Sequence, residues 1–263
     1  MDWLTSLPAA ALIIGGLGAA LLCAIGARLA LRALIPATQR DSVYTIADPL
    51  MTAFAGLFAL MVALTLASEA GLLVSAQGIV SNEAADASRL AWAATSPGVN
   101  PAPIQSALLG YLRATRAYEW QGNQAADGDD PATSHALAGL ERVVRAQAGR
   151  PGITTPIGSE LLASLDAITD DRRARLAAAS HELPAFYVIV LVVAGAAVII
   201  NATVLTLRSG WRLAFPVGAL AVVIGLSIAL LFALGTPWRG SITVSGQPID
   251  AVVHDLNTGY FQR

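Results

Sequence analysis

Four long apolar segments stand out along the chain, and they fall into two pairs. They cover residues 8–27, 49–68, 183–207 and 213–234, and none contains a charged side chain. A transmembrane helix needs about 20 apolar residues to cross the hydrocarbon core of a bilayer. The segments lack the alternating polarity of barrel strands, and helices satisfy their own backbone hydrogen bonds in lipid. The pattern therefore predicts four transmembrane helices in two hairpins.

The first apolar segment is predicted to remain in the protein as a membrane anchor. No positively charged residue precedes it, and it is longer than the apolar core of about 7–15 residues that is typical of a cleaved signal peptide. Cys23 lies deep inside the segment, directly after a leucine. We interpret this cysteine as a small packing residue rather than a lipid attachment site.

A polar insert separates the two predicted hairpins, and its apolar positions predict three amphipathic helices. Apolar side chains recur at helical spacing in three groups: Ile104, Leu108, Leu109 and Leu112; Leu137, Leu140 and Val144; and Leu161, Leu165 and Ile168. Segments rich in Gly, Pro and Asp separate these groups, as is typical of turns. We therefore expect the insert to be a helical bundle.

The predicted fold is an all-α membrane protein with four transmembrane helices and a helical-bundle insert. The first hairpin takes residues 1–76, the insert 77–182, the second hairpin 183–235 and a C-terminal tail 236–263. Leu72, Leu73, Ile79 and Val80 continue the apolar face of the second span, and no Gly-Pro stop interrupts it. We expect the helix of that span to run past the membrane into the insert.

The composition is that of a membrane protein and argues against several functions. Of the 263 residues, 55% are hydrophobic and 13% are charged, whereas about a quarter are charged in soluble domains. A net charge of -2 gives no basic field to attract nucleic acid. A single cysteine and three histidines exclude an internal disulfide and a Cys/His zinc site. No hydrolase, phosphate-loop or metalloprotease motif is present, so we expect neither an enzyme nor a bound cofactor.

The arginines do not settle the orientation in the membrane. The hairpin connectors carry Arg28, Arg32, Arg40, Arg208 and Arg212, which favours connectors on the cytoplasmic side. The opposite side carries as many: Arg89, Arg172, Arg173, Arg175 and Arg239. The density of arginines in the short connectors weakly favours cytoplasmic connectors, but the charges leave both orientations open.

The charged residues of the insert are first interpreted as solvent-exposed side chains and as ion pairs that stabilise helices. The segment Asp127–Pro131 resembles a calcium loop, but proline takes the fifth ligand position and Ala138 the twelfth, where a bidentate glutamate is needed. We interpret it as a solvated acidic turn. Asp171 with Arg175, like Glu141 with Arg145, forms a pair four residues apart, which is typical of helix support.

Several polar and bulky residues of the spans could serve either in helix packing or in a polar or ion-conducting pathway. Glu69 ends the second apolar segment, where it is either solvated at the membrane exit or faces protein or a water-filled cavity. Asn201 either holds two helices together or contacts a polar pathway. Phe54, Phe58 and Val62 share one face of the second span. That face meets lipid or another helix, or else forms a hydrophobic constriction around a symmetry axis.

Five short segments in a fixed order carry a resemblance to a known family. They are Glu83-Ala84 after the second span, Tyr118-Glu119-Trp120, the run Asp171–Leu176, Leu183-Pro184, and the run Pro237–Val244. Over about residues 45–260 the chain resembles the bestrophin-like family, bacterial multi-span membrane proteins distantly related to bestrophin anion channels.

This resemblance implies a homo-oligomer, a pentamer by analogy, with a pore on its symmetry axis that passes chloride or other small ions. Phe54, Phe58 and Val62 would then line the neck of the pore. It further implies an inner-membrane protein whose insert and termini are cytoplasmic, against the weak charge preference. The chain departs from true bestrophins after the second span, where Ser68–Leu73 replaces an Arg- and Trp-rich segment, and it lacks a recognisable acidic calcium clasp.

The residues that match the family pattern have a structural and a functional interpretation. Glu83, Glu119, Trp120 and Arg173 match it. A glutamate on the helix that leaves the membrane and an arginine on the helix that returns would pair across the insert and clamp the two hairpins together. Alternatively, these charges and Glu69 line an aqueous vestibule. Trp238 and Arg239 follow the last span and are expected to anchor it at the interface.

Two functions from different classes therefore stand side by side. The first is a passive ion channel lined by the second span, with the lipid bilayer and small anions as partners. The second is a membrane-anchored sensor or scaffold whose insert binds a partner without transport. A channel predicts that the Phe54 face lines an axial pore, whereas a scaffold predicts that this face is buried against other spans.

Overall fold

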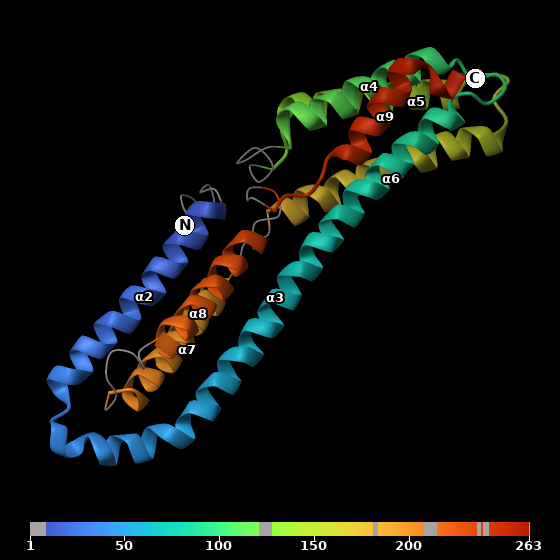
Figure 1. Ribbon diagram of the computed structural model, residues 1–263. Coiled ribbons are helices and arrows are strands. Elements are labelled where there is room, and N and C mark those ends of the chain that lie inside the picture. Colours follow the sequence, from blue (N-terminus) through green and yellow to red (C-terminus); the bar gives the residue numbers. More distant parts are fainter. Residues whose placement is uncertain are drawn as a thin grey trace. The chain divides into compact units, whose positions relative to one another are not determined.

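The computed structural model describes residues 9–120, 128–180, 184–207, 215–235, 238 and 242–262. Within these ranges the chain is helical and contains no strand, which confirms the all-α class (Figure 1). The α-helices are α2 (Ala9–Leu34), α3 (Arg40–Ala93), α4 (Pro101–Tyr118), α5 (Pro131–Ala148), α6 (Thr155–Ala179), α7 (Ala185–Leu205), α8 (Phe215–Leu234) and α9 (Gln247–Thr258). Two short 3-10 helices are η1 (Ala37–Gln39) and η4 (Tyr260–Gln262).

Four of these helices are long and apolar enough to span a membrane, as expected from the four apolar segments. They are α2, α3, α7 and α8. Their arrangement as two hairpins stays a prediction. The helix of the second span begins at Arg40, nine residues before the apolar segment, so that Pro49 lies inside it. A proline inside a helix removes a backbone hydrogen bond and kinks the helix, and Figure 1 shows a bend in the first part of α3.

The chain divides into two compact units. The membrane unit comprises residues 1–71, 182–236 and 240–242, and the insert unit comprises residues 72–181, 237–239 and 243–263. The single helix α3 contributes its first part to the membrane unit and its last part to the insert unit. The predicted continuation of the second span as one helix is thus present in the structure.

In the membrane unit, α2 packs on α8 through small residues. A Cβ placed at Gly225 would lie 2.7 Å from the backbone oxygen of Gly16, and one placed at Gly16 would lie 2.9 Å from that of Gly225. Ala20 and Ala229 continue the contact one turn along each helix. Small residues at four-residue spacing let helix backbones approach closely, which is a common way to join helices in lipid.

The insert unit has an apolar core of its own, built by α3, α4, α5, α6 and α9. The three predicted groups of apolar side chains supply much of this core, and only Leu109 among them remains half-buried. Asn100 caps α4 and Asp130 caps α5, each by accepting a hydrogen bond from a backbone N–H of the first turn. These local signals explain why the amphipathic helices begin where the turn segments end.

The C-terminal tail folds onto the insert unit. The Ser245 N–H donates to Oε1 of Gln77 at 2.8 Å, and the Gln77 side chain donates back to the Ser245 carbonyl oxygen at 3.3 Å. Helix α9 packs on α4, where Nε of Arg116 donates to Asp250 at 2.8 Å. Ile249 of α9 is fully buried in the core. Helix α9 is therefore part of the insert unit's core.

Candidate functional site

Two glutamates and two arginines form a buried cluster of charged side chains in the insert unit. Glu83 lies on α3, Glu119 follows α4, and Arg172 and Arg175 lie on α6. Nε of Arg175 donates to Glu83 at 2.7 Å, and its Nη2 donates to Glu119 at 3.0 Å. Arg172 also donates to Glu119. We call these four residues the charge cluster.

The charges of the cluster are almost completely withdrawn from water. The side chains of Glu83 and Glu119 are 0% exposed and that of Arg175 is 1% exposed. Burial by itself lowers the pKa of Arg175, but the adjacent carboxylates, Glu83 above all, raise it above the usual range. Two carboxylates and two guanidinium groups balance each other, so the cluster keeps its charges without a net charge in the core.

Tyr111 of α4 completes the cluster by donating its hydroxyl to Glu83 at 2.5 Å. Burial raises the pKa of Tyr111 well above its ordinary value, and the negative charge of Glu83 adds to this effect. The phenol therefore stays protonated and acts as a donor over the whole physiological pH range. Through Glu83, Tyr111 ties α4 to α3.

The acidic segment before α5 closes the outer side of the cluster. Arg172 Nη2 donates to the exposed carboxylate of Asp129 at 2.7 Å. Hydrogen bonds from Ser134 and Arg172 lower the pKa of Asp129. Asp130 caps α5, whereas Asp127 lies outside the described residues. Among the residues that the structure describes, no group of three or more His, Cys, Asp or Glu could hold a metal ion.

Aromatic rings cover the cluster on another side. Trp120 and Trp238 pack edge to face, with their ring centroids 5.3 Å apart. The guanidinium groups of Arg116 and Arg175 lie 4.6 Å and 5.9 Å from the centroid of Trp120. Both tryptophans are buried in the insert unit. The interfacial anchoring expected for Trp238 stays a prediction, and Arg239 lies outside the described residues.

The arginine expected to pair with Glu83 is not the one that does so. Arg173 is 74% exposed and pairs with Asp170 at 2.9 Å on its own helix, and Arg175 takes the position beside Glu83. Helical spacing explains the difference, because Arg172 and Arg175 continue the buried row of Leu165 and Ile168. Sequence reasoning missed both, although this periodicity was visible in the sequence.

Arg175 also does not form the expected helix pair with Asp171. Its guanidinium group turns toward Glu83 and Glu119 instead. Burial, followed by the nearby Asp86, raises the pKa of Asp171 to about 6. Asp171 therefore lies beside a second carboxylate rather than beside its expected cation.

The predicted face of the second span turns inward in the membrane unit. Phe58 is 7% exposed, and its ring would lie 3.2 Å from a Cβ placed at Gly195 of α7. Phe54 and Val62 are half-buried and pack against the same apolar cluster. Asn201 of α7 donates to the Ala47 carbonyl oxygen at 2.9 Å. Both contacts join α3 to α7.

Glu69, the last polar candidate of the second span, is also buried within the fold. It lies 11 residues after Phe58, which places both residues on nearly the same face of α3. The side chains of Leu57, Leu60 and Leu64 occupy the opposite, exposed face. Helix α3 thus has a packed face that carries the candidate residues and an open face of leucines.

Comparison with known proteins identifies the family directly. The family model described as a bestrophin-like domain matches residues 18–249, which is most of the chain. No curated protein and no solved structure matches. The matched range includes α3, α7, α8 and the charge cluster in full, and most of α2. The chain therefore belongs to the bestrophin-like family of membrane proteins.

Proposed function

We propose that the protein is an oligomeric, passive ion pathway for anions, lined by its second span. Membership of the bestrophin-like family supports a channel over an enzyme. The observation that carries the proposal is that the rest of the chain covers very little of the surface of α3. Only 6% of the residues in its most apolar window are buried, compared with 11% in α2, 44% in α7 and 39% in α8. A helix so uncovered within its own chain is available to face a neighbouring copy or a pore.

We assign the lining to the exposed leucine face of α3 rather than to the face of Phe58. A residue at a constriction must present its side chain to the axis, whereas Phe58 is 7% exposed and packs against α7. Leu57, Leu60 and Leu64 recur at helical spacing and are more than half exposed. Rings of such side chains around an axis gate ions by excluding water. The resemblance to bestrophins suggests five copies around that axis and a cytoplasmic insert.

The proposal is tested by thiol block of ion flux through single-cysteine variants. In a Cys23→Ala background, Leu60→Cys is reconstituted into liposomes and treated with a charged thiol reagent while chloride flux is recorded. We expect a block at position 60. Val193→Cys is the matched control because Val193 is an exposed apolar residue of α7, and its flux should not change. A block at Phe58→Cys but not at Leu60→Cys would reverse the assignment of the two faces.

The packing of Phe58 supports a second candidate, a membrane-anchored sensor or scaffold. In this alternative the spans only pack, and the insert unit, which has its own core, binds a partner. The two candidate functions predict different results for ion flux through liposomes. A scaffold passes no ion in liposomes in which a known channel is active, and its insert is then the part to screen for partners.

A further inference from the structure

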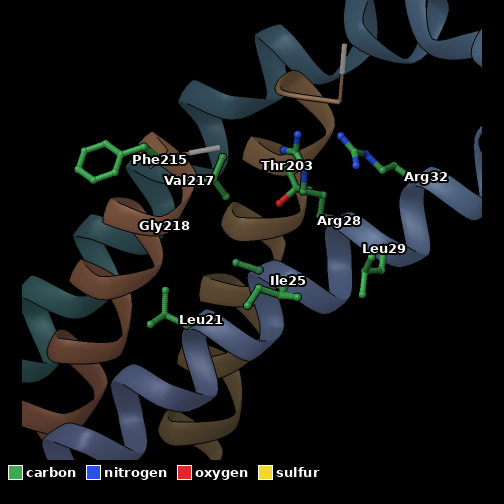
Figure 2. A pocket seen from close by; sticks show the side chains of 10 residues that line it. Leu21, Ile25, Arg28, Leu29, Arg32, Thr203, Phe215, Val217 and Gly218 are labelled. Carbon is green, nitrogen blue, oxygen red and sulfur yellow. The ribbon is translucent and has the colours of Figure 1, made fainter. Parts of the chain in front are cut away.

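The membrane unit contains a pocket of about 600 Å³ at one end of α2, α7 and α8. Figure 2 shows Arg28 and Arg32 of α2 near Thr203 of α7, with Phe215, Val217 and Gly218 of α8 on another side. The volume lies within the range of about 300–1,000 Å³ that is typical of small-molecule sites. This pocket is remote in sequence from the charge cluster and is not used by the proposed ion pathway.

One wall of the pocket is apolar and continues onto the exposed surface of α2. Leu21, Ile25 and Leu29 line it at four-residue spacing, so they form a row along the helix. All three side chains are exposed in the chain. Helix α2 is one of the four apolar helices, and its exposed leucine and isoleucine side chains therefore face hydrocarbon in a bilayer. A hydrocarbon chain lying along this row would stay in apolar surroundings throughout.

A second row beside the first is positively charged. Arg28 and Arg32 are also four residues apart, in the last two turns of α2. The Arg28 side chain is buried, and its Nη1 donates to the Thr206 hydroxyl over a long distance of 3.5 Å. Arg32 is exposed at the rim. Guanidinium groups bind phosphate through paired, charge-assisted hydrogen bonds.

The geometry points to a binding site for one anionic phospholipid, with its phosphate on Arg28 and Arg32 and an acyl chain along Leu21, Ile25 and Leu29. The two arginines favour an anionic headgroup by charge complementarity. The apolar row beside them favours a molecule that also has a hydrocarbon chain over a free anion. The last turns of α2 and the first described turn of α8 lie at the end of the apolar spans. Basic pockets between transmembrane helices on the matrix or cytoplasmic side of membranes bind anionic lipid headgroups, and the same chemistry applies to this pocket.

The test is a lipid titration of the full-length protein in neutral detergent. Phosphatidylglycerol, phosphatidylcholine and inorganic phosphate are added separately, and bound lipid is counted by native mass spectrometry beside thermal unfolding. We expect phosphatidylglycerol to bind at one copy per chain and to raise the unfolding temperature. Arg32→Gln should weaken this binding about tenfold, the effect of one lost charge-assisted hydrogen bond.

Two more variants separate binding from folding. Gly218→Leu should reduce lipid binding by filling the pocket, since a Cβ at Gly218 meets nothing within 4 Å and the protein should still fold. Arg150→Gln removes an exposed arginine of the insert unit and should leave binding unchanged. Equal binding of phosphatidylcholine, an equal effect of inorganic phosphate, or an equal loss in Arg150→Gln would each overturn the proposal.

Discussion

Arg175 and Glu83 are 92 residues apart in the chain and meet through a 2.7 Å ion pair that is almost fully buried. The pair joins α6 to the last part of α3, and Tyr111 brings α4 to the same carboxylate. Because the surrounding core is apolar, neither charge could remain there alone. These contacts give the charged residues a structural role, which is to hold the helices of the insert unit together.

Removing one charge of this pair should strongly destabilise the insert unit. Arg175→Met leaves Glu83 buried without its cation, which costs about 3–5 kcal/mol. We expect a large fall in the thermal unfolding temperature of the full-length protein in detergent. Arg173→Met removes an exposed arginine from the same helix, and its effect should stay within about 0.5 kcal/mol. Equal losses in the two variants would show that the buried pair is not the clamp.

The raised pKa of Asp171 predicts a specific dependence of stability on pH. Folding raises this pKa from 3.8 to about 6, so the folded protein holds a proton that the unfolded chain has already released. The stabilisation of the folded state by the protonated Asp171 is complete below pH 3.8 and is lost as the pH rises through about 6. Asp171→Asn should therefore stabilise the protein at pH 7.5 by about 1 kcal/mol, an amount reduced by solvent screening.

This prediction is checked by unfolding temperatures at pH 4.5 and 7.5. The pH dependence between these values should be flatter in Asp171→Asn than in the wild type. Asp166→Asn, which changes an exposed carboxylate of α6, serves as the control and should keep the wild-type profile. If Asp171→Asn is no more stable than the wild type at pH 7.5, the carboxyl group is not strained in the fold.

The close approach of α2 and α8 predicts intolerance to side chains at Gly225. Its neighbour is the backbone oxygen of Gly16, which cannot move without separating the helices. Gly225→Val should cost about 1–3 kcal/mol through overpacking. Gly26→Val is the matched control, because a Cβ at Gly26 meets nothing within 4 Å. Fluorescence-detected chromatography after heating measures both, and equal stability of the two variants would contradict the packing.

The hydrogen bond from Asn201 to Ala47 predicts a modest role in joining α7 to α3. Asn201→Leu should lower stability by about 0.5–1 kcal/mol, the usual size of such a bond between membrane helices. Ser227→Ala is expected to be neutral, because that hydroxyl donates only to its own helix at Val223. The same heating assay applies. A loss in Ser227→Ala as large as that in Asn201→Leu would remove the evidence for an interhelical role.

The helices could be predicted from the sequence because their signals are local. Runs of apolar residues define the spans, and periodic leucines with Gly- and Pro-rich turns define the insert helices. The start of α3 at Arg40 is not evident from the sequence, because Pro49 favours a helix boundary at that position, although a helix can accommodate a proline at a bend.

The candidate site was harder to predict because partners are set by tertiary packing. The sequence pointed to Glu83 and Glu119 but assigned their cation to Arg173, whose side chain lies on the exposed face of α6. The burial of Phe58 depends on Gly195, a residue 137 positions later that has no side chain to reveal the contact. The pocket beside Arg28 depends on how three helices meet, which no single segment shows.

The most direct test of the central claim is ion flux from liposomes that contain the purified wild-type protein. Chloride efflux and potassium efflux are compared with those of empty liposomes and with a known channel reconstituted in parallel. A passive anion pathway predicts chloride efflux well above the empty liposomes and above potassium efflux. Failure to pass chloride while the control channel is active would contradict the claim and favour the membrane-anchored scaffold.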